Sequence, residues 1–210
     1  MLLIANDISY SHVPNGKNIF ENLNFSIKSG ERIAITAPSG FGKTTLCKIL
    51  SGYELPNNGS VLLDDTPLNK FKGYCPIQMI WQHPEQVLNP RLKMKQILKE
   101  SGEINDKLLK DLGIQEKWLN RFPRELSGGE LQRFCIARVL NKKTKFLLAD
   151  EITTMFDLIT QSQIWQVILE FCKKENIGIV IISHSQPLIN KICTKEISLK
   201  DLIEQNNKKP

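Results

Sequence analysis

The chain has 210 residues, of which 41% are hydrophobic and 24% charged, and its formal net charge is +6. This much apolar side chain excludes a disordered polypeptide and is enough for one compact domain with a buried core. The longest apolar runs, such as residues 177–182, are far shorter than the roughly 20 residues of a membrane-spanning helix, so the sequence predicts no span. The first ten residues lack the basic start of a signal peptide, which favours a cytoplasmic protein.

The basic residues are unevenly distributed along the chain. Residues 83–145 hold 14 of the 28 Lys and Arg residues but only 8 of the 22 Asp and Glu residues, so the whole positive excess lies there. Two interpretations stay open: this segment faces acidic groups or anionic headgroups at a membrane surface, or it is an ordinary solvated face. The five cysteines form no CxxC pair, which argues against a zinc site and a disulfide framework.

The first third of the chain is rich in β patterns. Short strands are predicted at residues 2–4, 8–12, 25–27 and 32–36. Asn58 and Gly59 indicate a hairpin turn ahead of a strand at 60–63, because both residue types accept the positive φ that such turns require.

The remaining chain alternates between helical and strand patterns. Residues 94–118 show helical spacing interrupted by glycines, and a second helix is expected over 128–140. Residues 146–149 and 178–182 are continuous apolar runs, typical of strands buried on both faces of a parallel sheet. The helical stretch 159–175 between them completes a strand, helix, strand unit. The sequence therefore predicts an α/β fold.

A phosphate-binding loop is predicted directly after the strand 32–36. The segment SGFGKTT, residues 39–45, leads into a helical pattern, which is the context in which a P-loop is credible. Its glycines let backbone N–H groups point at phosphate oxygens, and the helix start adds a positive dipole end. Lys43 would reach the β- and γ-phosphates, and the Thr44 hydroxyl would bind Mg²⁺. The nucleotide-binding residues expected here are Ser39, Gly40, Gly42, Lys43, Thr44 and Thr45.

The P-loop pattern begins with an alanine in place of the usual glycine. Ala37 is tolerable there if it keeps a negative φ and its methyl group does not crowd the loop. We expect a slightly weakened phosphate site that still works.

Three further motifs follow in fixed order: LSGGE at 126–130, FLLADE at 146–151 and ISHS at 182–185. Together with the P-loop they resemble the ATP-binding cassette (ABC) ATPase family over nearly the whole chain. The resemblance implies a P-loop ATPase fold with a mostly parallel core sheet, an N-terminal antiparallel β subdomain and an inserted helical subdomain. It implies one domain over 1–210, in which 1–82 and 146–210 form the core with the β subdomain and 83–145 form the helical part.

The resemblance assigns metal and catalytic roles to residues around the P-loop. Asp150 ends a buried strand, where a carboxylate can hold Mg²⁺ through water, and Thr44 and Gln82 are expected as further Mg²⁺ ligands. Glu151 would polarise the attacking water. Gln82 would sense the γ-phosphate, and His184 would hydrogen-bond it. ATP and Mg²⁺ are thus the implied cofactors.

One aromatic side chain is expected to hold the base of the nucleotide. Tyr10 is the aromatic residue that the sequence places best for stacking on adenine, although an ordinary strand tyrosine is the alternative.

The LSGGE motif is expected to act on a different molecule. Ser127, Gly128 and Gly129 begin a helix, so their N–H groups and the serine hydroxyl form an anion site. In the family this site faces the γ-phosphate held by a second cassette, and Asp157 of the D-loop crosses the same interface. Residues 154–156 are larger than the family usually has before that aspartate, so we expect altered D-loop geometry and an altered hydrolysis rate.

The domains that are or are not fused to the cassette indicate which kind of ABC protein it resembles. The sequence shows no second cassette, no long heptad insertion and no fused membrane span, which leaves a stand-alone subunit that docks beneath separate membrane proteins. The element Asn89–Pro90–Arg91 resembles the oligopeptide, dipeptide and nickel importer ATPases. The resemblance implies a second ATPase subunit, identical or different, integral membrane permeases, and indirectly an extracytoplasmic solute-binding protein. It places the chain peripherally at the cytoplasmic face of the cell membrane.

Two other functions remain as alternatives to an importer ATPase. Ala37 and the altered D-loop are compatible with an ATP-binding regulatory subunit that hydrolyses ATP weakly. The net charge alone would suggest a nucleic-acid ATPase, but we expect no nucleic-acid partner.

Overall fold

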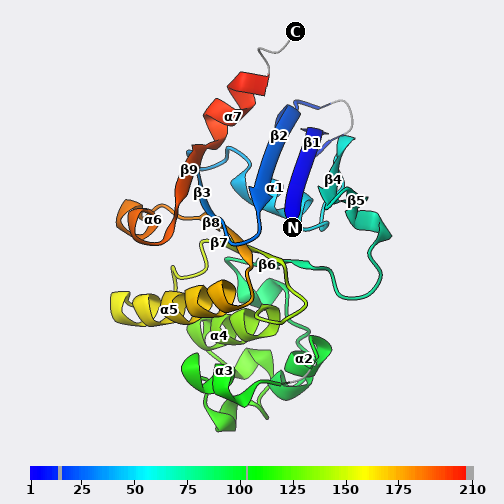
Figure 1. The fold of residues 1–210 in the computed structure, drawn as a ribbon. Coiled ribbons are helices and arrows are strands. Elements are labelled where there is room, and N and C mark those ends of the chain that lie inside the picture. Colours follow the sequence, from blue (N-terminus) through cyan, green and yellow to red (C-terminus); the bar gives the residue numbers. More distant parts are fainter. Residues whose placement is uncertain (14–15, 103, 207–210) are drawn as a thin grey trace.

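The computed structural model describes residues 1–13, 16–102 and 104–206 (Figure 1). Two sheets organise it, one antiparallel in the order β2-β1-β4-β5 and one parallel in the order β6-β7-β8-β3-β9. The antiparallel strands are β1 (Leu2–Tyr10), β2 (Phe20–Lys28), β4 (Asn58–Leu63) and β5 (Thr66–Pro67). The parallel strands are β3 (Arg32–Thr36), β6 (Ile77–Ile80), β7 (Phe146–Asp150), β8 (Gly178–Ile182) and β9 (Lys195–Ser198). The predicted α/β class, with both kinds of sheet, is confirmed.

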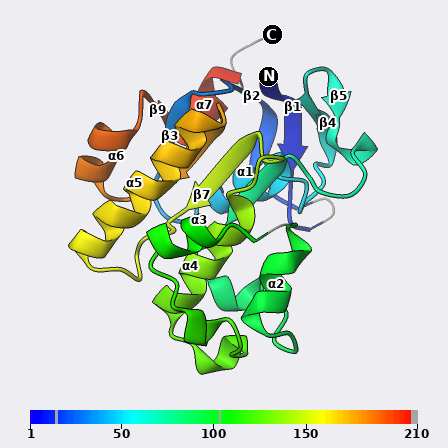
Figure 2. The ribbon, with the colours of Figure 1, turned by 60° about the horizontal axis from the view of Figure 1, so that its bottom comes forward.

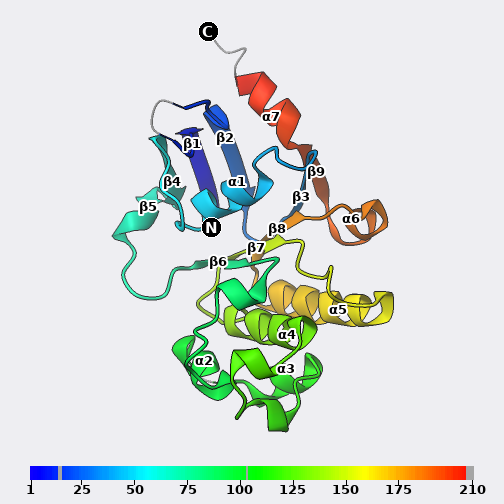
Figure 3. The same cartoon turned by 180° about the vertical axis from the view of Figure 1, so that it is seen from behind.

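Helices fill the space around the sheets. The α-helices are α1 (Lys43–Leu50), α2 (Met94–Glu100), α3 (Asp106–Asp111), α4 (Gly128–Val139), α5 (Leu158–Lys174), α6 (Gln186–Ile192) and α7 (Leu199–Asn206). Short 3₁₀ helices lie at Leu68–Lys70, Pro84–Gln86, Glu116–Trp118 and Pro123–Glu125. Seen from behind, α7 continues from β9 and lies beside β2 (Figure 3).

The central strands of the parallel sheet are apolar throughout because both of their faces are covered. Every residue of β7 and β8 is buried. Successive side chains of a strand point to opposite faces, and β7 follows this rule: Phe146 and Leu148 join one core cluster, whereas Leu147 and Ala149 join the other. The first cluster extends through α1 into the antiparallel sheet, and the second into α2, α4 and α5.

The helices of residues 83–145 gather on one side of the molecule, next to α5 (Figure 2). Their apolar side chains belong to the same core cluster as those of α5, β7 and β8. Because this cluster is continuous, it does not separate a helical subdomain from the rest of the chain. The subdomain boundaries at residues 83 and 145 stay a prediction.

One local prediction was wrong, that of the hairpin turn. Asn58 and Gly59 are the first residues of β4 and form no hairpin turn; a Cβ on Gly59 would lie 2.4 Å from the carbonyl oxygens of Asn6 and Asp7, so glycine is needed for close strand approach. The two-residue turn lies instead at Asp64 and Asp65, which have φ values of 44° and 65° and connect β4 to β5.

Within the described part of the chain, no helix combines the length and the apolar character that crossing a membrane requires.

Candidate functional site

The P-loop connects β3 to α1 and has the backbone that phosphate binding requires. Gly40 and Gly42 adopt φ values of 81° and 88°, a region that favours glycine. A Cβ on Gly42 would lie 2.6 Å from Cγ2 of Ile19, whereas one on Gly40 would meet no atom within 4 Å. The space next to Gly40 is therefore open to a ligand, and the tight packing of Gly42 against Ile19 holds the loop in place.

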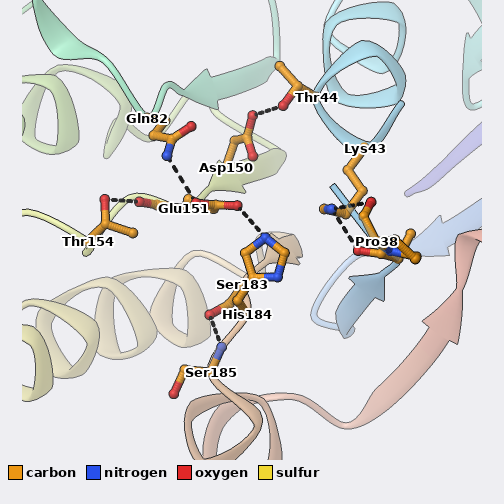
Figure 4. A network of polar contacts seen from close by, with 11 residues as sticks. Pro38, Lys43, Thr44, Gln82, Asp150, Glu151, Thr154, Ser183, His184 and Ser185 are labelled. Carbon is orange, nitrogen blue, oxygen red and sulfur yellow. Dashed lines mark hydrogen bonds and ion pairs between the residues drawn. The ribbon is translucent and has the colours of Figure 1, made fainter. Parts of the chain in front are cut away.

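Lys43 is buried and lies over the loop that it belongs to. Its Nζ donates hydrogen bonds to the carbonyl oxygens of Ala37, at 2.8 Å, and Pro38, at 3.1 Å (Figure 4). An ammonium group has three protons, so one remains for a phosphate oxygen. Ala37 has no positive φ, which meets the first of the two conditions under which alanine can replace the first glycine of the pattern. Of the other loop residues expected to bind nucleotide, Ser39 is exposed and Thr45 is buried in α1.

An oxygen pair suited to a divalent cation lies beside the loop. The hydroxyl of Thr44 donates a hydrogen bond of 2.6 Å to Oδ2 of Asp150, which ends β7 and is 3% exposed (Figure 4). Burial raises the pKa of the Asp150 carboxyl above its ordinary value, the Thr44 hydrogen bond opposes this, and the charge of Glu151 adds to it. A carboxylate and a hydroxyl oxygen at this spacing fit the oxygen preference of Mg²⁺.

Glu151 stands next to this pair and is held from two sides. Its φ of 51° turns the chain sharply after β7, and its amide donates to the carbonyl oxygen of Ile182 at 3.0 Å. Nε2 of Gln82 donates to Oε2 of Glu151 at 3.0 Å, and Nε2 of His184 lies 3.0 Å from Oε1 (Figure 4). Three predicted catalytic side chains from three loops thus meet at one carboxylate.

The signature residues have a separate environment. Ser127 caps α4 through a capping box: its hydroxyl accepts from the amide of Glu130 at 3.3 Å, and its own amide donates to the Glu130 carboxylate at 2.7 Å. Gly128 and Gly129 lie against the side chains of Met155 and Phe156. In the described contacts, these three signature residues are not joined to the P-loop.

The D-loop aspartate is exposed at the start of α5. Asp157 caps that helix by accepting from the amides of Ile159 and Thr160, each at 3.0 Å, and from the Thr160 hydroxyl at 2.8 Å. The backbone and side-chain hydrogen bonds of Thr160 hold the pKa of Asp157 below its ordinary value.

The structure argues against the predicted adenine stacking by Tyr10. The ring is 7% exposed and packs in the core, and its hydroxyl donates to Glu54 at 3.1 Å. The exposed ring at this end of β1 is His12, which stands edge-on to Tyr10 with 5.3 Å between ring centroids. The sequence reasoning missed His12 because it considered only Phe, Tyr and Trp, although an exposed imidazole also offers a flat ring. Because Ile19, which pairs with Tyr10, also touches Gly42, this strand end lies close to the P-loop.

The fold and the site together define a P-loop ATPase. Residues 20–154 match the family described as ABC transporter. This chain belongs to that family, and it is an ATP-binding ATPase subunit.

Curated relatives carry several transport functions. The chain is 36% identical to the lipoprotein-releasing system ATP-binding protein LolD of Rickettsia felis, covering 91% of this chain and 92% of that protein. It is 29% identical to the nickel import ATP-binding protein NikE of Shigella dysenteriae, covering 92% and 82%. It is 33% identical to the oligopeptide transport ATP-binding protein OppD of Lactococcus lactis, covering 82% and 58%.

Solved structures share the fold. A dimeric post-hydrolysis state of an ATP-binding cassette bound to ADP and Pi superposes with a TM-score of 0.77 at 24% identity and covers 90% of each chain. An ATP-binding subunit of an ABC transporter gives a TM-score of 0.81 at 21% identity, covering 99% of this chain and 94% of that one.

Proposed function

We propose that this chain hydrolyses ATP with Glu151 as the general base and thereby drives an ABC importer for a small solute such as a peptide or a nickel complex. The observation that carries the hydrolytic role is the placement of Glu151, whose two carboxylate oxygens are held by Gln82 and His184 beside the Thr44 and Asp150 pair.

Each residue of this group has a task in the proposed reaction. Glu151 accepts a proton from the attacking water, and Gln82 and His184 fix the direction of its carboxylate. His184 is 55% exposed, so its ring can also reach a terminal phosphate. Lys43 and the backbone amides at the start of α1 bind phosphate oxygens. Thr44 and Asp150, with Gln82 as a further ligand, would hold Mg²⁺, which supplies charge neutralisation on the phosphates when bound.

The signature turn is proposed to complete the site of another cassette. Ser127, Gly128 and Gly129 form a helix start, where the first amides have no backbone acceptor within the helix, although the Ser127 amide donates to the Glu130 carboxylate. The contacts described for these residues do not join them to this chain's own P-loop. Two cassettes, identical or different, would therefore clamp two ATP molecules, with Asp157 at the shared interface. The dimeric cassette of similar fold supports this arrangement.

Import is supported by the element after Gln82. Asn89, Pro90 and Arg91 resemble the peptide and nickel importer ATPases, and the relatives include NikE and OppD. The proposed partners are integral membrane permeases, with a solute-binding protein acting indirectly. The chain would then be peripheral at the cytoplasmic face of the membrane. Most of the basic side chains of residues 83–145 are exposed, which supports attraction to acidic groups there.

Lipoprotein release is a second candidate function. It is favoured by the 36% identity to LolD, which is higher than the 29% identity to NikE. Both candidates need the same ATPase chemistry and differ in the membrane subunits that the cassette serves.

Purification from detergent-solubilised membranes tests for membrane partners, and transport measurements separate the two candidates. We expect permeases to co-purify with the chain, and uptake of labelled peptide or Ni²⁺ to stop when Glu151→Gln replaces the wild type. Unchanged uptake together with lipoproteins retained in the inner membrane would establish lipoprotein release instead. If Glu151→Gln changes neither uptake nor lipoprotein release, a transport role is contradicted.

A further inference from the structure

The D-loop of this chain packs directly on the signature turn of the same chain. A Cβ built on Gly128 would lie 2.7 Å from Sδ of Met155, and one built on Gly129 would lie 3.3 Å from Cε1 of Phe156. The two unusually large D-loop side chains therefore occupy the space next to the two glycines. Methionine suits this role because its flexible, polarisable side chain fills irregular gaps.

The D-loop is held by hydrogen bonds at two consecutive residues, so these contacts are not those of a free loop. The buried hydroxyl of Thr153 accepts from Gln161 at 2.7 Å and from the Trp165 indole at 3.3 Å. The amide and the hydroxyl of Thr154 donate to the carbonyl oxygen of Glu151, at 3.3 and 3.1 Å. The segment that leaves the catalytic carboxylate is thus anchored to α5 before it reaches the signature turn.

The start of α4 is tied to the catalytic loops on its other sides as well. The guanidinium of Arg133 lies 5.3 Å from the centroid of the Phe156 ring, a cation–π contact that joins the second turn of α4 to the D-loop. Nε2 of the buried Gln132 donates to the carbonyl oxygen of Trp81 at 3.1 Å, directly before Gln82. Hence α4 contacts both the loop that carries Gln82 and the loop that follows Glu151.

We propose that Met155 and Phe156 are positioning residues that set where the signature turn stands relative to Glu151. This inference rests on the proposed role of the signature turn at a second cassette's nucleotide. Met155 is 40% exposed and fills the gap beside Gly128, and Phe156 holds the next glycine under the Arg133 contact. Loss of either side chain lets the turn shift, and small displacements of a catalytic group are costly, since about 1 Å of misplacement can reduce a rate roughly 100-fold.

A double-mutant cycle on the full chain, with any partner cassette it needs for hydrolysis, tests this role. We expect Met155→Ala to lower kcat by roughly threefold to thirtyfold with KM for ATP unchanged, because the P-loop is untouched. Met155→Leu, which conserves volume, should keep kcat near the wild-type value. Gly128→Ala must displace Met155 and should lower kcat in the wild-type background. In the Met155→Ala background the new methyl enters free space, so Gly128→Ala should cause no further loss.

Leu158→Ala is the matched control background, because Leu158 lies on the same segment, is apolar and is 83% exposed. There, Gly128→Ala should show its full loss. If the losses of Gly128→Ala and Met155→Ala simply multiply, Gly128 is needed for its own ligand contact and the positioning role is overturned. An unchanged kcat in Gly128→Ala and in Ser127→Ala would overturn the proposed signature function as well, so the two failures are distinguishable.

Discussion

The P-loop edge and the signature turn are both proposed to bind an anion at a helix start, but they are built in opposite ways. At the P-loop edge Lys43 and Asp150 are buried and the functional groups are hydrogen-bonded within the chain: Lys43 bonds its own loop, and the exposed Thr44 bonds Asp150 across 106 residues of sequence. At the signature turn Ser127 is exposed, and among the described contacts its hydroxyl bonds only the amide of Glu130 in the same helix. The sheet assembles the P-loop edge, which we call the first half-site, whereas the signature turn, the second half-site, has the D-loop packed against it and is proposed to act with a surface of another cassette.

The largest effect is expected at the carboxylate between the two half-sites. Glu151→Gln should slow hydrolysis by about 10² to 10⁴-fold, because it removes the proton acceptor. Equilibrium binding of ATP should persist, since Lys43 and the loop are intact. Single-turnover measurements on the assembled complex check this, with Glu175→Gln at the end of α5 as the matched control. Equal turnover in Glu151→Gln and the wild type would contradict the catalytic role of Glu151 and favour a regulatory subunit.

The role of the P-loop in binding ATP is tested by removing the buried ammonium group of Lys43. Lys43→Ala should weaken ATP binding by roughly tenfold to 100-fold, because hydrogen bonds to charged groups contribute about 1.5–3 kcal/mol. Lys48→Ala, on the same helix but placed over the Trp81 ring, should leave the affinity nearly unchanged. Titration with a fluorescent ATP analogue measures both. Similar affinities for the two variants would contradict the assigned phosphate contact.

A smaller effect distinguishes the exposed ring from the buried one. His12→Ala should weaken binding of adenine nucleotides by up to about tenfold, because ring stacking contributes about 0.5–1.5 kcal/mol. Tyr10→Phe keeps the buried ring and loses the hydroxyl contacts with Glu54, at 3.1 Å, and with Nδ1 of His12, at 3.4 Å, so it should bind normally. If Tyr10→Phe binds worse than His12→Ala in the same titration, the buried ring holds the base after all.

The smallest effect concerns stability. The pKa of Asp150 is raised by burial above its ordinary 3.8, so above that pH the unfolded state releases the proton more readily and folding stability falls. Asp150→Asn lacks this cost. Without nucleotide or Mg²⁺ it should melt a few degrees higher than the wild type at pH 7, since 1 kcal/mol corresponds to about 2–4 °C at this size. Thermal scans should show the gap closing as the pH falls toward 3.8; a lower Tm at pH 7 would refute the burial argument.

Local patterns predicted most of the fold and the chemistry of the first half-site. The apolar runs at 146–149 and 178–182 and the SGFGKTT segment each carry their information in consecutive residues. Contacts between segments that are distant in the sequence could not be predicted from such local patterns. Nothing local indicates that Met155 packs on Gly128, that Tyr10 points into the core while His12 stays exposed, or that Asp64 and Asp65 make the turn.

The two half-sites can be placed on different chains by mixing two inactive variants. Lys43→Ala disables the P-loop and Gly129→Asp disables the signature turn, so each variant alone should be inactive when it pairs with itself. In a mixed pair, one intact P-loop faces one intact signature turn. At a concentration where the wild-type chain is active, an equal mixture should therefore recover about a quarter of wild-type ATPase activity, since half of the pairs are mixed and each holds one working site. A mixture no more active than its two components would contradict a site shared between chains.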